Sequence, residues 1–79
     1  MKLTKYYDRI NTIYESLDDL IGELEETRDA IEDKAIERGR DMTEKEQERY
    51  EEIDEQIQAI ENCKDNLEYA MSEIEDYCA

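Results

Sequence analysis

The residues of this 79-residue chain that are able to do chemistry are carboxylates and two thiols. The chain has no histidine, so it lacks the commonest general base and the commonest metal ligand. Neighbouring carboxylates such as Glu25 and Glu26 would hold a divalent cation only loosely, because no loop is available to wrap the ion. No hydroxyl or thiol has an evident activating base, and no glycine-rich phosphate loop is present. We therefore expect a protein that is not an enzyme and uses no cofactor or metal.

The two cysteines are expected to be reduced thiols. Cys63 and Cys78 are separated by about 22 Å if they lie on one helix, which is beyond the reach of a disulfide. Two cysteines without histidine are also too few for a zinc site. We interpret both as small apolar side chains of a cytoplasmic protein.

Composition and charge exclude several kinds of partner. Charged residues make up 44% of the chain and the net charge is -15. Such a charge repels nucleic acid and anionic lipid, and it favours protein partners with a basic surface. No apolar run approaches the roughly 18 residues that span a bilayer, and residues 1–10 lack the apolar stretch of a signal peptide. We expect no membrane contact and a cytoplasmic location.

Apolar residues recur along two segments in alternating steps of four and three, the spacing that keeps one face of a helix against a partner helix. The first row comprises Leu3, Tyr7, Ile10, Tyr14, Leu17, Ile21, Leu24, Arg28, Ile31 and Ala35. The second row comprises Tyr50, Ile53, Ile57, Ile60, Lys64, Leu67, Met71, Ile74 and Cys78. The rows predict two helices, at about residues 4–38 and 44–78. The absence of proline and the presence of only two glycines argue against a β-rich fold.

The segment between the two rows carries the residues of a tight turn. Gly39 is well placed to end the first helix in a left-handed conformation. Thr43 and Glu46 have the spacing of a capping box, which would begin the second helix. The chain is therefore predicted to be a single all-α domain, residues 1–79, in which a turn at residues 39–43 folds two long helices into an antiparallel, coiled-coil-like hairpin.

One register closes every layer of this hairpin. If facing residues have numbers that sum to 81, Ile21 meets Ile60 and Leu24 meets Ile57. Two layers are impure, because Lys64 faces Leu17 and Arg28 faces Ile53. Long cationic side chains can lay their methylene groups over such a seam and send the charge to nearby carboxylates. We interpret both as devices that specify the register.

A second apolar strip lies beside the predicted seam, in the half of the rod that holds the chain ends. We name it the apolar ridge; it consists of Tyr6, Ile13, Leu20, Cys63, Ala70 and Tyr77. Exposed apolar strips flanked by charge commonly mark interfaces. The first expectation is a homodimer, in which two hairpins form a four-helix bundle. A foreign partner and a purely intramolecular core are the alternatives.

The half of the rod that carries the ridge is also strongly acidic. Residues 10–27 contain no cation, and Lys64 is the only cation after Arg49. A net charge of about -13 spread over roughly 40 Å gives about half the linear charge density of duplex DNA. The candidate partner-binding surface consists of Asp18, Asp19, Glu61, Asp65, Glu68, Glu73, Glu75 and Asp76. Tyrosines such as Tyr14 and Tyr69 could pack on arginine or aromatic side chains of a partner.

A short, very acidic, tyrosine-bearing and histidine-free chain resembles the small helical inhibitors that phages and mobile elements encode against host nucleases. This group includes anti-CRISPR proteins that occupy DNA-binding channels. The resemblance implies a stoichiometric inhibitor that mimics DNA and blocks a basic groove, in some members as a dimer. The alternative is a structural coiled-coil module whose apolar ridge serves only to build its own homo-oligomer or a scaffold.

Overall fold

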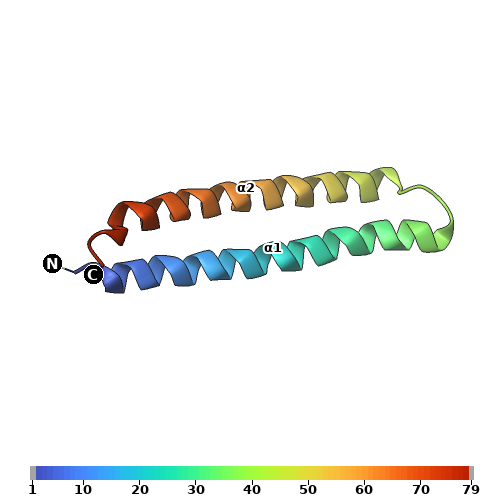
Figure 1. The fold of residues 1–79 in the computed structure, drawn as a ribbon. Helices are drawn as coiled ribbons and strands as arrows, with labels where there is room; N and C mark the ends of the chain where they lie inside the picture. Colours follow the sequence, from blue (N-terminus) through green and yellow to red (C-terminus); the bar gives the residue numbers. More distant parts are fainter. Residues whose placement is uncertain (1, 79) are drawn as a thin grey trace.

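The computed structural model describes residues 2–78, which form two α-helices joined by a short turn. Helix α1 spans Thr4–Arg38 and helix α2 spans Glu44–Glu75. The helices lie antiparallel and side by side, so that both chain ends are at the same end of the molecule (Figure 1). The Cα atoms occupy a rod of 60 × 15 × 12 Å. The predicted all-α hairpin is confirmed.

The two apolar rows form the only seam between the helices in the described chain, and every residue of both rows is buried or half-buried. Ile21, Ile53 and Ile57 form the centre of the seam, and Leu24, Ile31 and Ile60 pack against them. This grouping agrees with the register predicted from the sequence. A single seam leaves one flank of each side chain near water, and the most buried residue, Ala35, is still 4% exposed.

The turn is built from a motif at each helix end. Gly39 has φ of 67°, and the amides of Gly39 and Arg40 donate to the carbonyls of Ile36 and Ala35. At the start of α2, the amide of Glu46 donates to Thr43 Oγ1 at 3.2 Å, and the amide of Thr43 donates to Glu46 Oε1 at 3.0 Å. Both predicted motifs are therefore present.

The prediction for the end of α2 is wrong by three residues, because the helix ends at Glu75 and the chain then turns across the end of α1. The amide of Leu3 donates to the carbonyl of Tyr77 at 2.9 Å, and Thr4 Oγ1 donates to the carbonyl of Cys78 at 2.9 Å. The last turn of α2 contains no basic residue, and its carboxylates oppose the helix dipole. These hydrogen bonds between the two ends of the chain take the place of a further helical turn.

Candidate protein-interaction surfaces

The register of the hairpin divides the residues beside the seam into two sides. Each helix has one row directly beside the seam on each flank, and the antiparallel arrangement brings the corresponding rows of α1 and α2 together. The ridge side holds the rows Tyr6, Ile13, Leu20, Thr27, Lys34 and Arg49, Gln56, Cys63, Ala70, Tyr77. The opposite side, which we name the acidic side, holds the rows Thr4, Asn11, Asp18, Glu25, Glu32 and Gln47, Asp54, Glu61, Glu68, Glu75.

The acidic side holds about half of the 25 acidic residues of the chain and is distinguished by the lack of cations among them. From the end that holds the chain termini to Glu32, and together with the next row outward on each helix, it contains twelve of the 25 carboxylates, namely Asp8, Glu15, Asp18, Glu25, Asp29, Glu32, Glu51, Asp54, Glu61, Asp65, Glu68 and Glu75. None of the residues in these rows of the described chain is basic. By contrast, none of the residues in the two rows of the ridge side is acidic, and Lys34 and Arg49 lie among them.

The cation Lys64 leaves the seam toward the acidic side. Its Nζ donates to Asp18 Oδ1 at 2.6 Å and lies 4.8 Å from the centre of the Tyr14 ring. The Tyr14 hydroxyl in turn donates to Glu68 at 2.7 Å. This hydrogen bond to a carboxylate raises the pKa of Tyr14 above its ordinary value, and the bond to Asp18 raises the pKa of Lys64. The four side chains tie α1 to α2 along this side.

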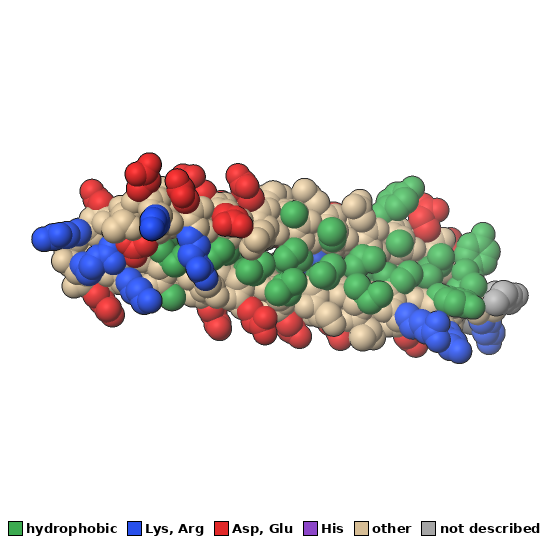
Figure 2. Space-filling view, turned by 180° about the vertical axis from the view of Figure 1, so that it is seen from behind, with side chains coloured by type: hydrophobic (Ala, Val, Ile, Leu, Met, Phe, Trp, Pro, Cys, Tyr) green, Lys and Arg blue, Asp and Glu red, His purple; other side chains and the backbone are tan. Residues whose placement is uncertain are grey.

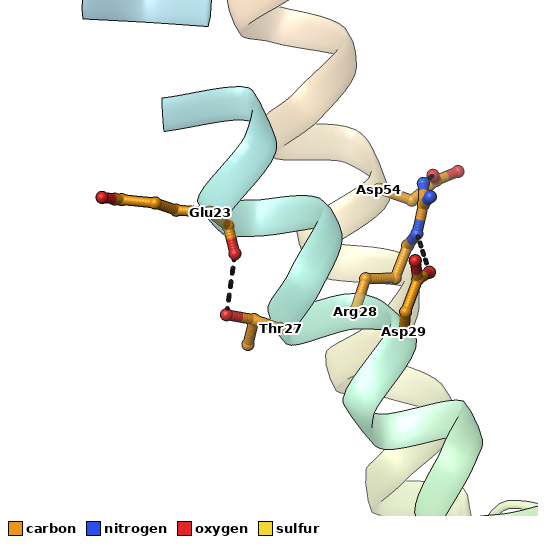
Figure 3. A network of polar contacts seen from close by, with 5 residues as sticks. All are labelled: Glu23, Thr27, Arg28, Asp29 and Asp54. Carbon is orange, nitrogen blue, oxygen red and sulfur yellow. Dashed lines mark hydrogen bonds and ion pairs between the residues drawn. The ribbon is translucent and has the colours of Figure 1, made fainter. Parts of the chain in front are cut away.

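Arg28 makes the equivalent contact in the middle of the rod. Its Nη1 donates to Asp54 Oδ1 at 2.8 Å, and its Nε donates to Asp29 at 3.4 Å. The bond to Asp54 is the main cause of a raised pKa of Arg28. Figure 3 shows these groups on one flank of α1 and Thr27 on the other, where its hydroxyl donates to the Glu23 carbonyl. The charged groups of Lys64 and Arg28 therefore both contact carboxylates beside the seam, as predicted.

The ridge side exposes an apolar strip over the half of the rod that holds the chain ends. Tyr6 is 46% exposed, Ile13 52%, Leu20 39% and Tyr77 61%. Figure 2 shows hydrophobic side chains running along this face from the middle of the rod to that end, with basic side chains at both ends of the face. Cys63 is exposed, whereas Ala70 is half-buried. The exposed fractions mean that these side chains do not complete an intramolecular core.

Toward the turn, the ridge side becomes polar and basic. A shallow hollow there is lined by Thr27, Ala30, Ile31, Lys34, Glu46 and Arg49. A second shallow hollow lies on the acidic side and is lined by Tyr14, Gln58, Glu61, Lys64 and Asp65. The first hollow therefore belongs to the ridge side, and the second belongs to the acidic side.

The structure separates the eight acidic residues of the predicted partner surface. Five of them lie on the acidic side, namely Asp18, Glu61, Asp65, Glu68 and Glu75. Asp19 falls on the outermost row of α1, Asp76 is the C-cap residue that follows α2, and Glu73 borders the ridge side. Sequence reasoning missed that the acidic side extends to Glu32 and Asp54, well beyond the half that carries the ridge. The signal was present, because carboxylates recur every seven residues at Asp18, Glu25 and Glu32.

Other chemically distinctive groups are isolated. Neither cysteine is in a disulfide, and Cys78 Sγ donates to the carbonyl of Ile74 at 3.3 Å. Within residues 2–78, no three carboxylate or thiol groups are arranged to hold a metal ion. The same part of the chain contains no helix long and apolar enough to cross a bilayer. Ile36 and Tyr69 are also exposed but lie outside the apolar ridge.

Fold and surfaces together define an antiparallel α-helical hairpin with one acidic side and one side that carries an apolar strip. Comparison of the chain with protein-family models, curated proteins and solved structures finds no match. The function is therefore inferred from the two surfaces.

Proposed function

We propose that this protein is a non-enzymatic, stoichiometric inhibitor whose acidic side occupies a basic, nucleic-acid-binding surface of a partner protein. The observation that carries the proposal is that twelve carboxylates on one side of the rod lie in rows that contain no basic residue among those described. Carboxylates also lie on the outer rows of both helices, but there they are mixed with Lys5, Arg9 and Lys45. A side on which every charge is negative suits a partner surface of opposite charge.

The spacing of these carboxylates supports mimicry of duplex DNA. From Glu75, near the end that holds the chain termini, to Glu32, near the turn, the carboxylates follow the rod for about 40 Å. This is about one carboxylate per 3 Å. Duplex DNA carries one charge per ~1.7 Å. The acidic rows of α1 and α2 are separated by about the interaxial distance of packed helices, roughly 10 Å, which lies between the widths of the two DNA grooves. A groove that accepts two phosphate strands would thus meet two rows of carboxylates.

The proposed setting is the cytoplasm, where thiols stay reduced, and the proposed class is the phage-encoded, anti-CRISPR type of DNA mimic. The apolar ridge is proposed to hold a second copy, so that the inhibitor acts as a homodimer. This arrangement leaves the acidic side free for the partner. The inhibitor itself would not bind nucleic acid, because like charges repel.

The test is capture of basic proteins by matched charge variants. The first variant carries Glu61→Lys, Asp65→Lys and Glu75→Lys, which lie on the acidic side and outside the contacts made by Lys64 and Arg28. Immobilised wild-type protein is expected to retain a protein from a heparin-binding fraction of a bacterial lysate and to release it when duplex DNA or 1 M NaCl is added. The variant is expected to lose at least about tenfold in retention.

The control variant carries Asp33→Lys, Glu48→Lys and Glu55→Lys, which lie on the outermost row near the turn. It has the same net charge as the first variant, and it is expected to retain the partner with less than about a threefold loss. Circular dichroism checks that both variants remain helical. Equal retention by the two variants, or retention that duplex DNA does not relieve, would reject the proposal.

The exposure of the apolar ridge favours the second candidate, a structural coiled-coil module that builds only its own oligomer. In that case the wild-type protein would self-associate but retain nothing from the heparin-binding fraction that depends on the acidic side. The same experiment therefore separates the two functions.

A further inference from the structure

We infer that two copies of this chain pack through their apolar ridges as antiparallel, half-overlapping rods, with a twofold axis between Ile13 and Ala70. The inference deepens the proposed homodimer, and it concerns the ridge side, whereas the proposed inhibition concerns the acidic side. It adds which residues meet and how the acidic sides are displayed.

The ridge residues follow one another along the rod in alternation between the helices. Because residues whose numbers sum to about 81 share a level, the order from the open end is Tyr77, Tyr6, Ala70, Ile13, Cys63 and Leu20. The middle of this strip falls between Ala70 and Ile13. A twofold axis there, perpendicular to the rod, places each ridge on the ridge of the second copy and on nothing else.

The apolar residues alone fit two arrangements. In the antiparallel one, Ile13 meets Ile13 of the second copy, Tyr6 meets Leu20 and Tyr77 meets Cys63. In a parallel, fully overlapping one, Tyr6 meets Tyr77 of the second copy and Leu20 meets Cys63. Both bury the same exposed side chains, so the charges beside the ridge decide between them.

The charges favour the antiparallel arrangement. Full parallel overlap would place Lys34 opposite Arg49 of the second copy, in rows where the described chain has no carboxylate to separate them. Antiparallel overlap carries both residues past the end of the second copy. It also brings the cationic start of the chain to the level of Glu23 of the second copy, a carboxylate that borders the ridge side.

The contact area sets the expected affinity. The strip from the level of Tyr77 to that of Leu20 is about 24 Å long, and two helices side by side are about 20 Å wide. Such a contact would bury on the order of 1,000 Å² in total, which is at the lower limit for a stable interface. We therefore expect a dimer with a dissociation constant in the micromolar range. The two acidic sides then face outward in opposite directions along a rod of about 90 Å.

Disulfide trapping tests the arrangement. In a background with Cys63→Ser and Cys78→Ser, Ile13→Cys is expected to form a covalent dimer under mild oxidation, because the two copies of that position meet at the axis. Leu20→Cys in the same background is the matched control. Its two copies would be about 24 Å apart and are expected to remain uncrosslinked.

The opposite pattern would overturn the inference. A covalent dimer formed by Leu20→Cys in a chain that keeps Cys63 and carries Cys78→Ser, without crosslinking of Ile13→Cys, would indicate parallel rods. Sedimentation of the wild-type protein as a monomer at 100 µM would reject the homodimer in either arrangement. Neither result bears on the acidic side, whose capture experiment stands independently.

A pair of aspartate variants separates the interface from the fold. Ile13→Asp is expected to raise the dissociation constant of the dimer at least about tenfold while helicity is kept, because this side chain is 52% exposed in the hairpin. Ile60→Asp places a charge in the seam and is expected to abolish helicity. Equal loss of helicity in both variants would indicate that Ile13 belongs to the intramolecular core.

Discussion

Lys64 and Arg28 interrupt the apolar seam, and their contacts explain why they are tolerated there. Each lays its stem between the helices and places its charge against a carboxylate of the acidic side, Asp18 or Asp54. The carboxylates are well exposed, so each ion pair contributes little to the free energy of unfolding. The contacts are more important for register, because a shifted pairing would bury a cation opposite an apolar residue without a partner.

Protonation of Glu46 is coupled to the fold through the contacts of its carboxylate. It accepts from Arg38 through both carboxylate oxygens and from the Thr43 amide, and the bond to Arg38 is the main reason that its pKa falls to about 2. A folded-state pKa below the unfolded value of 4.5 stabilises the fold fully above pH 4.5. That contribution is lost as the pH falls from 4.5 toward 2.

The prediction concerns the difference in the free energy of unfolding between wild type and Glu46→Gln. This difference is expected to be largest near pH 7 and to lose most of its value by pH 2, as measured by urea unfolding at several pH values. Glu48→Gln is the control, because the Glu48 side chain, also in the first turns of α2, makes no hydrogen bond or ion pair to the described residues. A difference that stays constant with pH would contradict the assignment.

At the scale of the helices and their turn, the two glycines have opposite roles. Gly39 adopts φ of 67°, a conformation that a side chain disfavours, and it ends α1. Gly22 lies within α1 without a positive φ, and a Cβ atom there would meet nothing within 4 Å. The same substitution is therefore expected to act in opposite directions at the two sites.

Gly39→Ala is expected to lower the free energy of unfolding by about 1 kcal/mol, and Gly22→Ala to raise it by about 0.5–1 kcal/mol. Urea unfolding at one fixed protein concentration measures both, since self-association adds to the apparent stability. Each variant serves as the control for the other. Destabilisation by both would mean that Gly22 has a packing role that the hairpin does not reveal.

The sequence predicts the helices and the turn almost completely, because a single seam is specified by local spacing. Every residue of the two rows is at least half-buried, and Gly39, Thr43 and Glu46 act as expected. The end of α2 could not be predicted from spacing, since Tyr77 and Cys78 continue the apolar pattern. It depends on hydrogen bonds to Leu3 and Thr4, which are distant in the sequence.

For the molecule as a whole, the net charge of -15 opposes compaction. The four ion pairs among residues 2–78 offset little of it, and the helices hold two acidic rows close together on one side. Salt should therefore stabilise the hairpin by screening repulsion between carboxylates. The thermal midpoint is expected to rise by on the order of 5 °C between 20 mM and 0.5 M NaCl.

Thermal unfolding followed by circular dichroism measures this effect. A variant with Glu61→Gln, Asp65→Asn and Glu75→Gln is expected to respond less to salt, because it carries less charge on the acidic side. A midpoint that falls as salt is added would instead show that the ion pairs outweigh the repulsion.

The candidate surfaces are less predictable from the sequence than the fold. The apolar ridge follows from the spacing, and its large side chains are exposed. Its separation from the acidic side requires the register, because Glu68 and Asp18 adjoin only when α1 and α2 are paired. Charge counts along the chain therefore located the acidic half but not the acidic side.

The hydrogen bonds between Leu3 and Tyr77 and between Thr4 and Cys78 hold the two chain ends side by side. This position of the ends predicts how the molecule responds to mechanical force. A load applied to the two chain ends pulls on neighbouring points of the molecule. It would therefore open the layers of the seam one after another, starting with the layer next to these hydrogen bonds. A load applied along the rod axis would have to slide all the layers at once. The hairpin should therefore be weak when unzipped from its ends and much stronger when sheared lengthwise.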